Sequence, residues 1–281
     1  MKFNHGSLLG ALSLVGSCVS SAAIYVDNFE SIAFLDDMTA PSVGWSSNDP
    51  TANVGKIVNA QNAGGTFGSR SGSIGYVAPI LASSAYVSRA VSTPLVGGGV
   101  NAYASVDFFI QDSDAGEGPG AEARDKFGFR FEDGSGNNIF SLFLNPFDQD
   151  SSPQTDVAYH TLSWSTGNNI PTVVLPGVAV QENTLATPTS PYTFAISFTP
   201  SGANDVAFNA TIGGSSFGGT LAGLATTNIE KFGAFWTPLN GPANPGSNFM
   251  IFDNVSVIPE PSAALLGLLG ATVAFTRRRR A

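Results

Sequence analysis

The residue that most demands a chemical explanation is Asp253. It lies in the apolar run Phe249–Val257, where strict alternation places its side chain on one face with Ile251, Val255 and Val257. A carboxylate on a core-facing side costs several kcal/mol unless a partner compensates it. The sequence therefore predicts that Asp253 has a specific partner, and backbone N–H groups at a sheet edge would be sufficient.

Side chains for hydrolytic catalysis are sparse. His160 is the only histidine outside residues 1–23, so a Ser-His-Asp triad has little support, and we expect His160 to be an exposed strand residue. Paired carboxylates for glycoside hydrolysis must converge within ~5 to 9.5 Å, but no compact Glu-x-Asp-x-Glu strand motif occurs. The sequence thus predicts no catalytic residue and no enzyme, with a polysaccharide-active hydrolase or lyase as the weakest alternative.

Aromatic side chains are candidates for sugar stacking, because a flat ring has an apolar face and polar edges. The tryptophans and tyrosines of interest are Trp45, Trp164, Trp236, Tyr86, Tyr103, Tyr159 and Tyr192. Trp236 shares a face with Phe232 and Ala234, which favours burial. Trp45 lies in a polar segment, so it is the predicted ligand-binding platform.

The elements that would position these residues are strands. Lys126–Glu132 and Tyr192–Thr199 alternate apolar and polar residues, as half-buried antiparallel strands do. Ten further candidates are residues 24–29, 74–80, 85–91, 100–110, 138–144, 157–164, 173–175, 205–212, 231–236 and 249–258. Residues 133–137 and 213–215 are predicted hairpin loops. Because these candidates are all strands, the predicted fold is all-β. No linker divides residues 24–258, so we expect one two-sheet antiparallel sandwich.

The composition excludes several classes of protein. Residues 24–261 contain seven of the twelve Lys and Arg but all 21 Asp and Glu, giving a net formal charge of −14. Nucleic acid is therefore not an expected partner, whereas carboxylates are available for divalent cations. The only cysteine is Cys18, so residues 24–258 can form neither a disulfide nor a thiolate metal site.

The N-terminus has the pattern of a secretory signal peptide. Lys2 precedes an apolar core from Leu8 to Val19, and Ser21-Ala22-Ala23 supplies small residues for cleavage after Ala23. A helical signal peptide over residues 1–23, signal peptidase as a partner and export are the predictions. Lipidation of Cys18 is the alternative, because residues 15–18 faintly resemble a lipobox.

The C-terminal segment has the pattern of a second targeting signal. Pro259-Glu260-Pro261 precedes the apolar run 262–275, and Arg277, Arg278, Arg279 and Arg280 follow. Fourteen residues span roughly 21 Å as a helix, less than the ~30 Å hydrocarbon core. The arginines are expected to stay on the cytoplasmic side of the membrane. A short tail that merely associates with the membrane is the alternative.

Order, spacing and terminal position make residues 259–281 resemble the PEP-CTERM sorting signal of Gram-negative bacteria. This resemblance implies an exosortase as partner, a transient inner-membrane anchor through the helix, and release or attachment at the cell surface. It also implies an association with extracellular polysaccharide and biofilm. The expected role is therefore structural or adhesive, and a carbohydrate-binding module that recognises matrix polysaccharide is the alternative.

The body of the chain resembles jelly-roll domains at two places. The opening residues 26–30, with Trp45 following, are similar to the start of carbohydrate-binding jelly rolls, and residues 249–257 resemble a closing strand. The resemblance does not choose between a concanavalin-like and a galactose-binding-like sandwich. It implies a structural calcium ion held by Asp253 together with Asp27, Asn28 and Glu30, since oxygen ligands suit calcium.

Overall fold

A computed structural model describes twelve segments of the chain. They are residues 25–31, 44–47, 55–58, 70–75, 85–94, 96–97, 100–111, 125–147, 159–167, 173–181, 190–237 and 249–259. These segments consist of strands and their connections. None of the described residues belongs to a helix of the length and apolarity needed to cross a membrane.

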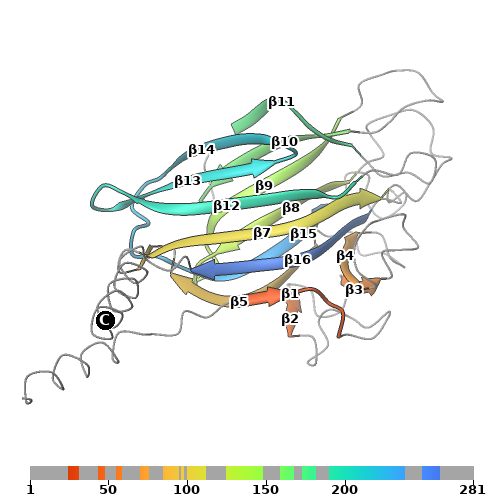
Figure 1. Cartoon of the computed structure of the whole chain (residues 1–281), viewed down its shortest axis with the longest axis horizontal. Helices are drawn as coiled ribbons and strands as arrows, with labels where there is room; N and C mark the ends of the chain where they lie inside the picture. The colour runs from red at the N-terminus through yellow and green to blue at the C-terminus, as the bar shows by residue number, and fades with distance from the viewer. Residues whose placement is uncertain are drawn as a thin grey trace, which may run out of the picture.

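The strands follow one another along the chain with turns or longer segments between them (Figure 1). Their bounds are β1 Tyr25–Asp27, β2 Trp45–Ser47, β3 Gly55–Val58, β4 Ser71–Gly75, β5 Ala85–Pro94, β6 Val96–Gly97, β7 Val100–Gln111, β8 Lys126–Glu132, β9 Asn138–Phe147, β10 Tyr159–Thr166, β11 Val173–Gln181, β12 Tyr192–Ser201, β13 Asp205–Ile212, β14 Ser215–Leu221, β15 Asn228–Thr237 and β16 Phe249–Pro259.

These strands form two antiparallel sheets, one in front of the other in Figure 1. The nine-stranded sheet has the order β14-β13-β12-β7-β16-β4-β3, with β1 added beside β16 and β6 beside β7. The seven-stranded sheet has the order β11-β10-β9-β8-β15-β5-β2. On the side of β16 away from β7, β4 pairs with residues 249–252 and β1 with residues 255–257. The last strand therefore joins three others.

The core between the sheets is rich in phenylalanine. Phe129 of β8 lies near its centre, with its ring stacked on Phe194 and Phe232 at centroid distances of 6.0 and 5.9 Å. Phe108 and Phe252 meet Phe129 edge to face. All five side chains are fully buried, and each contributes about 1.5–3 kcal/mol by leaving water. Alternation along the strands thus supplies one continuous apolar layer.

Two hairpins have the turn chemistry that the sequence predicts. In β8–β9, Asp133 accepts hydrogen bonds from the main-chain N–H groups of Ser135 and Asn137, each at 2.8 Å, and from the Asn137 side chain. These bonds lower the pKa of Asp133, with the Asn137 side chain the largest cause. In β13–β14, Gly213 and Gly214 have φ values of 55° and 82°, the backbone that a two-residue hairpin turn of type I′ requires.

The predicted all-β, two-sheet antiparallel architecture is confirmed, and it is consistent with a jelly-roll sandwich. The predicted strands β8 and β13 have the observed bounds. Four observed strands were not predicted, namely β2, β3, β6 and β14. The predicted signal-peptide helix and sorting helix lie outside the described residues.

Candidate functional site

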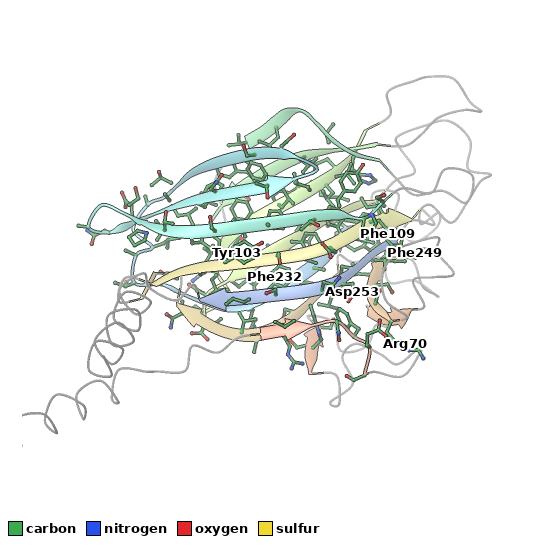
Figure 2. The ribbon with its side chains drawn as sticks, viewed as in Figure 1. Arg70, Tyr103, Phe109, Phe232, Phe249 and Asp253 are labelled. Carbon is green, nitrogen blue, oxygen red and sulfur yellow. The ribbon has the colours of Figure 1, made fainter. Side chains whose placement is uncertain are left out.

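Asp253 lies on the outer face of the nine-stranded sheet. The register of β16 against β7 shifts between Asp253, opposite Asp107, and Ser256, opposite Ser105, so β16 has one extra residue here. Asn254, with a left-handed φ of 50°, marks this β-bulge. The outer face is defined here as the face turned away from the core, and Figure 2 shows Asp253 on it.

The bulge reverses the alternation of β16. Before it, Met250 and Phe252 belong to the core, whereas after it Val255 and Val257 do. The prediction that Asp253 shares a face with Val255 and Val257 is therefore wrong, because an alternation count assumes that no residue is inserted.

Asp253 and Asp107 are directly opposite each other, an arrangement that repels when both are charged. Asn254 connects them: its main-chain N–H donates to Asp253 Oδ1 at 2.7 Å, and its Nδ2 donates to Asp107 Oδ2 at 3.0 Å. Thr193 Oγ1 donates to Asp107 Oδ1 at 2.6 Å. Although it faces outward, Asp253 is only 1% exposed. Local donors thus supply the partner that the sequence predicted for Asp253.

The predicted calcium ligands are brought near one another only in part. β1 pairs with β16, so the backbone of Asp27 lies opposite Val255. Its side chain lies outside the described part of the structure. Asn28 Oδ1 accepts a bond from the Glu30 N–H at 3.4 Å, and Glu30 Oε1 accepts one from the Arg70 N–H at 3.1 Å. Within the described ranges, no three His, Cys, Asp or Glu side chains form a group that could hold a metal ion.

Trp45 is buried, so its predicted role as an exposed stacking platform is wrong. It lies in β2 and is 3% exposed, with its ring 5.8 Å from Phe29 and 5.6 Å from Phe252. Alternation turns the neighbouring Ser46 outward, where its hydroxyl meets that of Ser88 at 3.2 Å. A strand of three residues has too few positions for this alternation to be visible in the sequence.

His160 is also buried, contrary to the expectation that it is an exposed strand residue, and so is Asp125 beside it. Both are 0% exposed. Asp125 accepts a hydrogen bond from the Trp236 indole N–H at 2.6 Å, and its main-chain oxygen lies 3.3 Å from His160 Nε2. The predicted burial of Trp236 is confirmed. His160 alternates with Thr161 and lies on the side of Leu162, a signal that the sequence did contain.

The outer face of the seven-stranded sheet has a different kind of side chain. Tyr86 of β5 is opposite Phe235 of β15, which is opposite Gly128 of β8, and Gly128 is opposite Phe143 of β9. The rings of Phe143 and Phe235 meet at 5.4 Å with an interplanar angle of 64°. We call Tyr86, Phe235 and Phe143 the aromatic row. Its three rings are half-buried and cross four strands.

Two glycines make room for this row. A Cβ on Gly128 would lie 2.3 Å from the Phe235 ring and 2.1 Å from the Leu142 carbonyl oxygen. A Cβ on Gly233 would lie 2.6 Å from the Tyr86 ring. The rings therefore lie low over glycine backbone, which holds them along the sheet surface.

Charged side chains flank the aromatic row along β8. Lys126 Nζ is 5.3 Å from the centre of the Phe143 ring, and the Arg130 guanidinium is 5.5 Å from the centre of the Tyr86 ring, both within the range of cation–π attraction. Arg130 also forms an ion pair of 3.1 Å with Glu132. Burial, followed by the charge of Glu132, raises the pKa of Tyr86 far above its ordinary value.

Small polar side chains fill the rest of this outer face and are almost inaccessible to solvent. They are Ser88, Asn138, Ser141, Ser163 and Ser165. Several bond to one another, as Asn145 Nδ2 does to Ser163 Oγ at 2.7 Å and Ser141 Oγ to Asn138 Oδ1 at 2.9 Å. At the aromatic row, the long side chains that a ligand could reach are the three rings, Lys126 and Arg130. Of these, the sequence singled out Tyr86 alone.

The predicted sorting residues are described only at their first position. Pro259 ends β16 opposite Ala102, so the backbone is extended there. Glu260, Pro261 and Arg277–Arg280 lie outside the described residues, as do residues 1–23.

Comparison with known proteins gives a likeness of fold. No family model and no curated protein matches this chain. Among solved structures, the carbohydrate recognition domain of Emp46p in its potassium-bound form is similar at a TM-score of 0.50, with 9% identity over 84% of this chain and 97% of that chain.

Two other solved structures are less similar. The basic winged bean lectin with Tn-antigen has a TM-score of 0.47, with 11% identity over 83% of this chain and 96% of that one. The carbohydrate esterase of Shiga toxin-encoding bacteriophage phi24B has a TM-score of 0.47, with 13% identity over 84% of this chain and 100% of that one. At such identities the likeness concerns the fold alone, a jelly-roll β-sandwich.

Proposed function

We propose that this protein binds carbohydrate through the outer face of its seven-stranded sheet. The observation that carries the proposal is the aromatic row, in which three half-buried rings lie along the sheet over Gly128 and Gly233. Sugar rings stack on such surfaces through their apolar C–H faces, while polar groups beside the rings bond to hydroxyls. Lys126 and Arg130 are the partly exposed charged groups beside the rings.

The proposal includes no catalytic step. The only histidine among the described residues, His160, is 0% exposed and lies on the core side. Asp107 and Asp253, which are opposite each other in the register, belong to the other sheet and are bonded to Asn254. A polysaccharide-active enzyme would need accessible acids beside the aromatic row.

Glycan-array binding by the purified full-length protein tests this proposal. Phe235→Ala should weaken binding to the recognised glycan by about tenfold, because one stacking ring is lost. Tyr103→Ala is the matched control: Tyr103 is an aromatic residue of β7 on the outer face of the other sheet (Figure 2), and its loss should leave binding unchanged. Absence of binding by the wild-type protein, or equal losses in the two variants, would contradict the proposal.

Export and sorting form the second part of the proposal. We infer from residues 1–23 and 259–281 that the chain is exported, transiently held in the inner membrane and processed by an exosortase. At the cell surface or in the extracellular matrix, polysaccharide binding would give the protein its adhesive role. Glu260→Ala should abolish removal of the tail without blocking export, as the mass of the exported protein would report. Normal tail removal in this variant would refute exosortase processing.

A further inference from the structure

Positive charge is concentrated on two neighbouring strands of the seven-stranded sheet. Residues 24–258 contain seven Lys and Arg, and three of them, Lys126, Arg130 and Lys231, belong to β8 and β15. Strands β7, β12, β13, β14 and β16 contain none. The same two strands contain two carboxylates, Glu132 and Glu230, so they have one more cation than carboxylate in a chain that is otherwise strongly acidic.

Lys126 and Arg130 stand on either side of the aromatic row. Each is two residues from Gly128 along β8, so their Cα atoms are roughly 13 Å apart at ~3.3 Å per residue. The register places no carboxylate directly beside either cation: Thr237 is opposite Lys126, and Ser141 and Gly233 are opposite Arg130. A ligand along the row would therefore meet positive charge at both margins.

The nearest carboxylate is largely withdrawn from solvent. Glu132 is 5% exposed, and its Oε1 accepts the ion-pair bond from Arg130 Nη1. The Arg130 side chain is nevertheless 39% exposed. Its Nε is buried, so the donors that a ligand could reach are those of the two Nη groups. Arg130 thus retains donors beyond those that Glu132 uses, since a guanidinium has five. The ammonium of Lys126 likewise keeps its donors while it lies against Phe143.

We propose that the ligand of this face is an anionic polysaccharide, with sugar rings on the aromatic row and carboxylates on Lys126 and Arg130. This inference rests on the proposed carbohydrate-binding function. The negative charge of the whole chain would repel such a polymer at long range. At physiological salt, however, exposed charges act over only about 8 Å, so the cations beside the row determine the local interaction.

Binding to immobilised polygalacturonate, a uronate polymer, and to dextran, a neutral one, tests the inference. The full-length protein is measured with a chelator present, because a divalent cation could otherwise bridge two acidic partners. We expect a preference for polygalacturonate that decreases when the salt concentration is raised to about 0.5 M. Lys126→Gln should weaken polygalacturonate binding by about tenfold, the loss of one charge-assisted hydrogen bond, and leave dextran binding unchanged.

Two further variants make the result specific. Lys231→Gln removes a cation from the same outer face but outside the row, opposite Glu132, and should have little effect. Arg130→Lys keeps the charge beside Glu132 but removes the planar fork, so a smaller loss than that of Lys126→Gln is expected.

The outcomes separate this inference from the proposed function. Equal binding to both polymers, or array binding to neutral glycans alone, would overturn the anionic ligand while leaving carbohydrate binding intact. Equal losses in Lys126→Gln and Lys231→Gln would assign the effect to overall charge, which also overturns the inference. If the wild-type protein binds no glycan on the array and neither polymer, both the inference and the proposed function fail.

Discussion

The two outer faces of this sandwich cover the same core with different side chains. Over β12–β14 the nine-stranded sheet presents short, uncharged side chains to solvent, among them Thr193, Asn209, Thr211, Ser216 and Thr220. The seven-stranded sheet presents half-buried rings with cations beside them. The inward positions of both sheets are almost uniformly apolar. The fold therefore depends on one set of alternate positions, while the other set is available for recognition.

The two sheets also differ in how the carboxylates on their outer faces are paired. Asp107 and Asp253 on the nine-stranded sheet are opposite each other and joined by Asn254. On the seven-stranded sheet, Glu132 is paired with Arg130. The first arrangement needs a β-bulge, whereas the second needs only two residues of one strand on the same face.

The largest expected effect comes from inserting one alanine directly after Asn254. The bulge accommodates a single extra residue, so the insertion would turn the following residues of β16 to the opposite face, and Val255 and Val257 would leave the core. Each is fully buried and worth about 1.5–3 kcal/mol, so the free energy of unfolding should fall by several kcal/mol. Urea unfolding measures this loss.

Asn254→Gly is the control for that insertion. It keeps the extra residue, and glycine adopts the left-handed backbone readily. Only the bond from Asn254 Nδ2 to Asp107 is lost, so the cost should be about 1 kcal/mol or less. An insertion as mild as this substitution would mean that the number of residues at the bulge does not set the alternation of β16.

A smaller effect is expected from Gly128→Ala beneath the aromatic row. The new methyl group would overlap the Leu142 carbonyl oxygen and the Phe235 ring, and overpacking of this kind costs about 1–3 kcal/mol. Gly134→Ala in the β8–β9 loop is the control, because its nearest neighbour would be Glu230 Cγ at 3.4 Å. Equal unfolding midpoints for the two variants would show that Phe235 does not lie over Gly128.

The smallest effect should come from Tyr86→Phe, and it should appear only at alkaline pH. Burial and Glu132 raise the pKa of Tyr86 above its ordinary value of 10.0. The unfolded chain therefore loses this proton near pH 10 while the folded protein keeps it. The corresponding stability is present below pH 10 and is lost as the pH rises further.

Urea unfolding at about pH 8 and pH 11 checks this expectation. The wild-type protein should lose more stability between the two values than the Tyr86→Phe variant does. The same loss in both proteins would mean that the Tyr86 hydroxyl is accessible to water, which would weaken the case for a low-lying aromatic row.

Much of the fold was predictable because long strands show a clear alternation of apolar and polar residues. Lys126–Glu132 and Asp205–Ile212 alternate without interruption, and the glycines at 213 and 214 mark their turn. Strand β14 was missed because its inward positions include Gly219 and the partly exposed Phe217, so its apolar pattern is weak. Pairing with β13 supplies the order that its side chains do not encode.

The candidate site was less predictable, for two physical reasons. First, the bulge at Asn254 has no signature in composition, and it changes which neighbours Asp253 has. Second, the aromatic row joins Tyr86, Phe143 and Phe235, residues far apart in the sequence that become neighbours only through the strand order β9-β8-β15-β5. Alternation predicts that Phe143 and Phe235 face outward, but it does not predict that they meet.

The position of β16 has a consequence for the order of folding. This strand pairs with β7, with β4 and with β1, so strands from the beginning of the chain have no place in the nine-stranded sheet until it arrives. Pairings between strands this distant in sequence form slowly, because the long intervening chain loses conformational entropy before the contacts between the strands compensate for it. During synthesis, the strand edges of β1 and β4 that pair with β16 would stay unpaired until β16 has been made. A chain stopped before Phe249 would keep those edges exposed, and it would be prone to pair with other chains.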